Sequence, residues 1–433
     1  SFAMSLAAAF VIRHFSGPLA EHVLMEPRCA PLLSVMAFAI PCTSVHACIC
    51  GYYYGKEKVS VPAAAQLFEQ TIRIFTVSGC IEKRIPVTVS LAVFGLVAGE
   101  AGSALFVLIF FLLFHEFHEN TGRSCRIGQS SIKNPLFRNS ERISDLSGNL
   151  FSPMSALLAL AAPLMANRLI LNLLQSAETI MIPERLTVYG LTRSQAVSTY
   201  GTLTGMAMPF VLFPSALVNS LAVVLLPATA RHQSAGNDSG IAAGISMSFR
   251  YSLYLGIFCI GVFTVFGDVL GLQIFKSQDA GSFIQILAWL CPFLYLATSS
   301  GSILNGLGKT KLTFFHHLVS LLVRIAFVWF GIPEFGIRAC LWGMLASEIL
   351  LSLLHILALR RSVSYDWNVW TFIGKPVFCL LCALWIFRLF PEELPIPAGF
   401  PDFFRTAAQV LILSTVYLLF LLFFHRKQDQ ITS

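Results

Sequence analysis

The chain has 433 residues, of which 56% are hydrophobic and only 12% are charged, and its mean hydropathy is +0.74. Soluble domains carry about a quarter charged residues, so this chain has too little polar surface to face water on all sides. The composition excludes an ordinary soluble enzyme. It also gives no support to a nucleic-acid partner, because basic loops that set membrane topology explain the net charge of +7.

The hydrophobic residues form blocks of about 20 to 30, long enough to cross a hydrocarbon core about 30 Å thick as helices. Helices are favoured because each satisfies its backbone hydrogen bonds within itself, and the alternating strands of a barrel are absent. The sequence therefore predicts an all-α polytopic membrane protein with about a dozen apolar segments. We expect them at 1–15 (in part), 31–50, 62–80, 86–115, 152–182, 195–228, 246–275, 281–306, 312–332, 336–360, 370–390 and 403–425.

A polar stretch from His115 to Asn149 divides the chain into two halves. Its five Lys and Arg residues belong to the set of loops that is richer in basic residues. Loops on the cytoplasmic side carry more Lys and Arg, which places this stretch and the C-terminus in the cytoplasm. The first segment is short, and no signal peptide with a cleavage site precedes it, so we expect the chain to begin partway through a helix.

An internal repeat relates the two halves. At a shift of 251 residues, apolar, Pro, Gly and basic residues coincide; at a shift of 248, Gly, Ala and Glu coincide. The matched pairs are Ala37 and Ala288, Pro41 and Pro292, Gly55 and Gly306, Lys58 and Lys309, Arg73 and Arg324, Ile74 and Ile325, then Gly95 and Gly343, Ala98 and Ala346, and Glu100 and Glu348. An even number of crossings separates the halves, which predicts parallel repeats of the kind found in alternating-access transporters.

Ionisable and polar residues inside the apolar segments are the candidate functional residues, because a charge in a span tends to face a cavity or a partner. Two sets share a helical face: one in the segment at 62–80 and one in the segment at 152–182. The cavity candidates are Gln66, Glu69, Arg73, Arg168, Asn172, Gln175 and Arg324, and the structural or coupling candidates are Glu100 and Glu348.

Each candidate has two interpretations. Arginines in a polar cavity would bind phosphate or pyrophosphate through their planar fork, whereas interhelical salt bridges would only hold the bundle together. Glu69 and Arg73, at i and i+4, could serve either role. For Arg168 the cavity is favoured. For Glu100 and Glu348 the symmetric placement beside Gly or Ser favours packing.

Motifs of catalysis are missing from the sequence. His115-Glu116-Phe117-His118 has the wrong spacing for a zinc protease, and there is no Walker motif, no Ser/His/Asp set and no pair of catalytic carboxylates. The Cys379/Cys382 pair lies in an apolar segment, where packing is favoured over redox or metal chemistry. We therefore expect no enzyme activity, no resident metal and no cofactor, and no residue identifies a coupling ion.

Three stretches closely resemble stage V sporulation protein B and related polysaccharide exporters. They are MANRLILNLLQSAETIMIPERL from Met165 followed by YGTLTGMAMPFVLFPSALVNSLAVVLLPATA from Tyr200, ICGYYYGKEKVSVPAAAQLFEQTIRI from Ile49, and GEAGSALF from Gly99. This family belongs to the multidrug, oligosaccharidyl-lipid and polysaccharide exporter superfamily. The resemblance implies two pseudo-symmetric helical lobes followed by two extra helices. On that pattern the chain is N-terminally truncated and its first lobe is incomplete.

The resemblance implies an incomplete N-terminal helical lobe at 1–115, a cytoplasmic inter-lobe loop at 116–151, a six-helix lobe at 152–360, and two additional transmembrane helices with a cytoplasmic tail at 361–433. It implies a flippase for a lipid-linked oligosaccharide or peptidoglycan precursor, used in envelope or spore cortex synthesis, with Arg73 and Arg168 on the diphosphate. Its partners would be the lipid-linked sugar, membrane lipids and cell-wall synthases. It would be located in the bacterial cytoplasmic (inner) membrane. The alternatives are a drug/cation antiporter of the same superfamily and a non-transporting scaffold.

Overall fold

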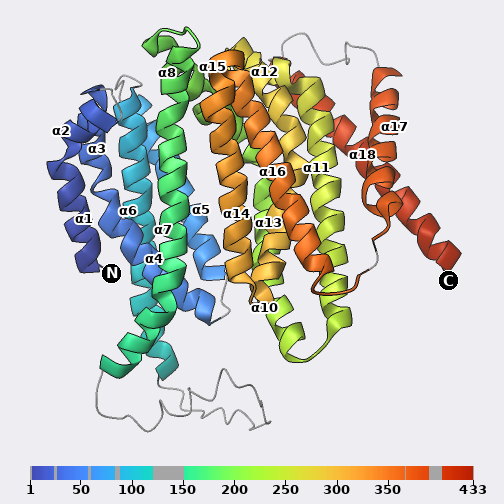
Figure 1. The fold of residues 1–433 in the computed structure, drawn as a ribbon, viewed down its shortest axis with the longest axis horizontal. Coiled ribbons are helices and arrows are strands. Elements are labelled where there is room, and N and C mark those ends of the chain that lie inside the picture. The colour runs from blue at the N-terminus through green and yellow to red at the C-terminus, as the bar shows by residue number, and fades with distance from the viewer. Residues whose placement is uncertain are drawn as a thin grey trace. The chain divides into compact units, whose positions relative to one another are not determined.

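The computed structural model describes residues 2–23, 27–56, 60–82, 88–119, 151–365, 367–389 and 402–432 (Figure 1). Every regular element within these residues is a helix. The chain divides into two compact units, Ser1–Asp145 and Leu146–Ser433. Because each unit has its own packed helices, the two are described separately.

The first unit is built around α6, which packs along α5 and also against α3 and α4. Its α-helices are α1 (Phe2–His14), α2 (Ser16–Pro18), α3 (Ala30–Met36), α4 (Ala39–Gly55), α5 (Ser60–Glu82) and α6 (Val89–Glu119). α6 therefore runs four residues beyond His115 into the stretch predicted to be a loop. The remaining part of that loop, 120–150, lies outside the described residues.

Glycines on one face of α6 allow its close approach to α5. A Cβ placed on Gly99 would lie 3.1 Å from the backbone carbonyl oxygen of Glu69, and one placed on Gly95 would lie 2.6 Å from Val77 Cγ2. Gly95 and Gly99 are four residues apart, the small-xxx-small spacing that lets two membrane helices meet backbone to backbone. This contact sets Glu100, the residue after Gly99, beside the polar residues of α5.

The second unit holds most of the buried apolar core, with Phe249, Ile284, Tyr295 and Leu304 among its fully buried side chains. α13 lies at its centre, against α10, α11 and α16, and the C-terminal helices α17 and α18 pack on α11. The α-helices are α7 (Phe151–Val188), α8 (Arg193–Thr202), α9 (Met208–Leu212), α10 (Ser215–Ser234), α11 (Asp238–Phe275), α12 (Gln278–Leu287), α13 (Cys291–Gly306), α14 (Thr310–Ala326), α15 (Ile332–Phe335), α16 (Ile337–Arg360), α17 (Lys375–Leu389) and α18 (Asp402–Thr432).

Local capping explains where several of these helices begin. The Thr192 hydroxyl and the Gln195 side chain form a capping box at the start of α8. The side chain of Asn237 accepts a hydrogen bond from Gly240 N at 2.9 Å at the start of α11. Each cap satisfies backbone N–H groups that have no partner within the helix, so the helix boundaries follow from the sequence.

The helix boundaries agree with the internal repeat. Shifted by 251 residues, α4 falls on α13 and α5 falls on α14 and the turns after it, while a shift of 248 sets the start of α6 near the start of α16. The close contacts repeat as well. A Cβ on Gly95 would lie 3.8 Å from the carbonyl oxygen of Arg73, and a Cβ on its mate Gly343 would lie 3.7 Å from the carbonyl oxygen of Arg324.

The described residues contain fewer span-length helices than the dozen apolar segments expected. Within them, 7 helices are long and apolar enough to cross a membrane, or up to 9 if each bent pair is one span. The segment at 62–80 is one reason: it forms α5, but Gln66, Glu69 and Arg73 lower its hydropathy, and α5 is not among these helices.

Two predicted segments are broken rather than continuous. The segment at 31–50 bends by 41° between Pro27–Met36 and Ala39–Tyr54. The segment at 195–228 bends by 60° between Arg193–Leu212 and Ser215–Ser234. The second bend lies at Pro214, whose ring and missing N–H interrupt the helical hydrogen bonds. The fold class itself is confirmed: the chain is an all-α, multi-pass membrane protein.

Candidate functional site

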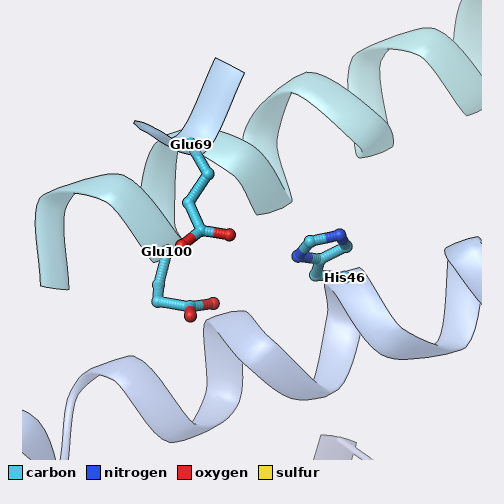
Figure 2. A group of neighbouring side chains, drawn as sticks. All are labelled: His46, Glu69 and Glu100. Atoms are coloured by element: carbon cyan, nitrogen blue, oxygen red, sulfur yellow. The ribbon is translucent and has the colours of Figure 1, made fainter. Parts of the chain in front are cut away.

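The first unit gathers two carboxylates and an imidazole at one place. His46 on α4, Glu69 on α5 and Glu100 on α6 turn their polar ends toward one another (Figure 2), and their ligand atoms all lie within 4.8 Å of one another. All three side chains are half-buried. Imidazole nitrogen and carboxylate oxygen are the donor atoms that proteins offer to cations.

Hydrogen bonds hold this cluster in place. The Thr43 hydroxyl lies 3.2 Å from Glu100 Oε2, and the Ser103 hydroxyl lies 3.2 Å from the Ala65 carbonyl oxygen and 3.3 Å from His46 Nδ1. A carbonyl oxygen can only accept, so Ser103 bonds both groups only when His46 Nδ1 donates to it. Neutral His46 then carries its lone pair on Nε2 and can accept a proton or bind a cation there.

Arg73 compensates one of the two carboxylates. Its guanidinium donates to Glu69 Oε1 at 2.6 Å, as the i, i+4 spacing predicted, and reaches Gln70 Oε1 at 3.3 Å. Glu69 is paired with Arg73, whereas Glu100 forms no ion pair among the described residues. The cluster therefore favours a cation over an anion.

In the second unit, Arg324 is bonded to a residue that the sequence analysis did not single out. Its guanidinium donates to Glu178 Oε2 at 2.7 Å, and the two side chains are 21% and 5% exposed. Arg324 lies on α14 and Glu178 on α7, which pack together. Arg73 and Arg324, which the repeat aligns, are thus both paired with a glutamate, one on its own helix and one on another.

The predicted polar face of α7 is exposed. Arg168, Asn172 and Gln175 all lie on the surface of the second unit, and no described residue forms an ion pair with Arg168. This face belongs to the second unit, whereas Gln66, Glu69 and Arg73 belong to the first. Gln66 is likewise exposed, on α5 of the first unit.

Glu348 faces a cavity in the second unit. It contributes to the lining of a cavity of about 320 Å³, and its Oε2 atom is buried without a hydrogen-bond partner among the described residues. Glu100, its repeat mate, instead lies in the cluster of the first unit. Sequence reasoning missed His46 and Glu178, although each is an ionisable residue inside an apolar stretch, the same signal that selected Glu100.

No family model matches the chain. Stage V sporulation protein B of Bacillus subtilis (strain 168) is 23% identical over 436 residues, an alignment that covers 99% of this chain and 80% of that protein. This chain is a distant homologue of that protein. The resemblance found in the sequence is thereby confirmed. Sporulation protein YkvU of the same organism is 23% identical over 209 residues, covering 48% of this chain and 47% of that protein.

Solved structures share the fold of this chain. The lipid II flippase MurJ in an inward closed conformation superposes with a TM-score of 0.66 at 14% identity, covering 99% of this chain and 82% of that one. The Vibrio cholerae MATE transporter VcmN, in its bent form, gives a TM-score of 0.58 at 14% identity over 83% of this chain and 76% of that one. These proteins carry the names of a flippase and a transporter, and neither name is that of an enzyme.

Proposed function

We propose that the chain is a flippase that moves a lipid-linked oligosaccharide or peptidoglycan precursor across the membrane by alternating access. The observation that carries the proposal is likeness along almost the whole chain: 99% of it aligns with stage V sporulation protein B, and 99% superposes on a lipid II flippase. The substrate would carry a diphosphate between its lipid and its sugar, so the protein needs a cationic group on a polar, accessible surface.

Arg168 is the residue that we assign to the diphosphate. Its side chain is exposed, no described carboxylate neutralises it, and Asn172 and Gln175 on the same face can donate further hydrogen bonds. Arg73 and Arg324 fit this role less well, because each already bonds a glutamate within 2.7 Å. A planar guanidinium can bind two phosphate oxygens at once, and a lysine cannot reproduce that geometry.

The cluster of His46, Glu69 and Glu100 is the place that we assign to ion coupling. Its imidazole nitrogen and carboxylate oxygens would attract a cation to α4, α5 and α6. A bound cation relieves the repulsion between the two carboxylates, so binding would stabilise the packing of these three helices. We place the chain in the bacterial inner membrane with its C-terminus in the cytoplasm. Its partners would be membrane lipids and cell-wall synthases.

The test is translocation of a labelled undecaprenyl-diphosphate sugar in proteoliposomes by Arg168→Gln, with Arg231→Gln as the matched control. Arg231 is also exposed and lies in the last turn of a different helix, α10. We expect Arg168→Gln to lower the initial rate at least tenfold and Arg231→Gln to retain it, since a charge-assisted hydrogen bond contributes about 1.5–3 kcal/mol. Equal rates for both variants would contradict the assignment of Arg168.

A drug/cation antiporter is the second candidate function. It is favoured by one observation, the cluster of two carboxylates and an imidazole in the first unit, and the MATE transporter VcmN shares the fold of this chain. Efflux of a fluorescent organic cation from the same proteoliposomes, together with no movement of the lipid-linked sugar, would favour the antiporter. A scaffold for envelope synthesis would move neither compound.

A further inference from the structure

The second unit contains a cavity of about 320 Å³ between α10, α13, α14 and α16. Its apolar lining comes from three leucines, an alanine and a glycine. Its polar lining is Thr298, Ser302, Asn305, Thr313, His317 and Glu348. Leu226 and His317 are exposed, so the cavity is reached from the surface of this unit.

Glu348 supplies a carboxyl group to the lining of this cavity. Its Oε2 atom is buried without a hydrogen-bond partner among the described residues. The nearby cation Arg324 already bonds Glu178 at 2.7 Å. A buried carboxylate oxygen without a donor is costly, and a ligand that brings donors and a positive charge would remove this cost.

The hydroxyl groups of the lining face the cavity as acceptors. Thr298 donates its proton to the Leu294 carbonyl oxygen at 2.8 Å, Thr313 donates to the Lys309 carbonyl oxygen at 3.2 Å, and Ser302 donates to the Ala222 carbonyl oxygen. Each hydroxyl has only one proton to give, so what remains for a ligand is its lone pairs. A carboxylate and three hydroxyl oxygens therefore favour a cation that carries hydrogen-bond donors.

The size and apolar wall of the cavity favour an organic cation over a bare metal ion. Its volume equals about ten waters at about 30 Å³ each, whereas metal ions are held by several oxygens at about 2.0–2.6 Å. The repeat relates this cavity to the cluster of the first unit. At the shift of 251 residues, Thr43 and His46, which fill the cluster of the first unit, are replaced by Leu294 and Ala297 in the cavity wall.

We propose that this cavity binds a small organic ammonium ion, with its N–H groups on Glu348 and the lining hydroxyls and its apolar part against the leucines. The ammonium group can belong to a free amine or to the headgroup of a lipid. Such a site is separate from the α7 face assigned to the diphosphate. The two proposals can therefore fail independently.

The experiment measures binding of benzylammonium at neutral pH to the purified chain in detergent by calorimetry, with benzyl alcohol as the neutral probe of similar shape. We expect benzylammonium to bind at least tenfold tighter than benzyl alcohol. Glu348→Gln should weaken benzylammonium at least tenfold, and Glu334→Gln, which changes an exposed acid of the same unit, should leave its affinity unchanged. Thr298→Val should weaken it about two- to tenfold, since it removes one acceptor while preserving shape.

Absence of benzylammonium binding, or equal affinities of the unmodified chain and Glu348→Gln, would overturn the proposal, as would equal affinities for the two probes. Thermal unfolding of each variant checks that it is folded. Repeating the titration in nanodiscs with and without phosphatidylethanolamine identifies the source of the ammonium group. Competition by this lipid supports a headgroup ligand, and unchanged binding supports a free amine.

Discussion

Replacing Glu178 with Gln is expected to destabilise the second unit by about 2–4 kcal/mol. The substitution keeps the shape of the side chain and removes the charge that Arg324 bonds at 2.7 Å. Breaking a buried ion pair costs about 3–5 kcal/mol because the remaining charge has no partner. Glu178 is only 5% exposed, but Arg324 is 21% exposed and water can reach part of it. The expected loss of stability is therefore somewhat smaller than that for a fully buried pair.

The assay is equilibrium unfolding in mixed micelles, followed by tryptophan fluorescence, with a double-mutant cycle as its control. Glu178→Gln combined with Arg324→Gln removes both charges, so the double variant should be more stable than Glu178→Gln alone. Glu69→Gln, which breaks the ion pair with Arg73 in the first unit, should lower the free energy of unfolding by less than about 1 kcal/mol. Its effect is smaller because Arg73 is 31% exposed and lies on the same helix as Glu69. An unfolding free energy for Glu178→Gln equal to that of the unmodified chain would refute the reasoning.

Two further predictions concern packing. Gly99→Leu should lower the free energy of unfolding by about 1–3 kcal/mol, since a Cβ there would lie 3.1 Å from the Glu69 carbonyl oxygen and α5 would have to move. Gly51→Leu is the matched control, because a Cβ there would have nothing within 4 Å; equal losses of stability would contradict the close approach. Arg185→Gln should lower the free energy of unfolding by about 0.5–2 kcal/mol and change the tryptophan emission, because the guanidinium carbon lies 3.3 Å from the centroid of the Trp329 ring. An unchanged spectrum and stability would contradict this contact.

The helical membrane fold and the internal repeat could be predicted because both depend on local composition and on residue order. The apolar blocks predicted α11, α13 and α16, and the match of Gly95 with Gly343 marked a close helix contact that recurs in both units. Apolar length alone did not reveal the bend at Pro214. Apolar length also predicted α5 as a membrane span. Polar residues on one face of α5 lower its hydropathy without interrupting the helix, and α5 is not among the helices apolar enough to cross a membrane.

The partners of the candidate residues could be predicted only where they lie on one helix. The spacing of Glu69 and Arg73 indicated their ion pair, whereas Arg324 bonds Glu178, which is 146 residues away in the sequence. Pairings of that kind depend on how helices pack, and one sequence does not specify this. The cavity beside Glu348 arises in the same way, from residues contributed by four neighbouring helices.

Translocation of a labelled undecaprenyl-diphosphate sugar by the unmodified chain in proteoliposomes tests the central proposal most directly. An impermeant reagent that destroys the label on the outer leaflet reports the fraction of lipid that has crossed. We expect loss of label well beyond the half exposed at the start, at a rate that scales with the number of chains per vesicle. Loss that stops at the level of protein-free vesicles would contradict the assignment of this chain as a flippase.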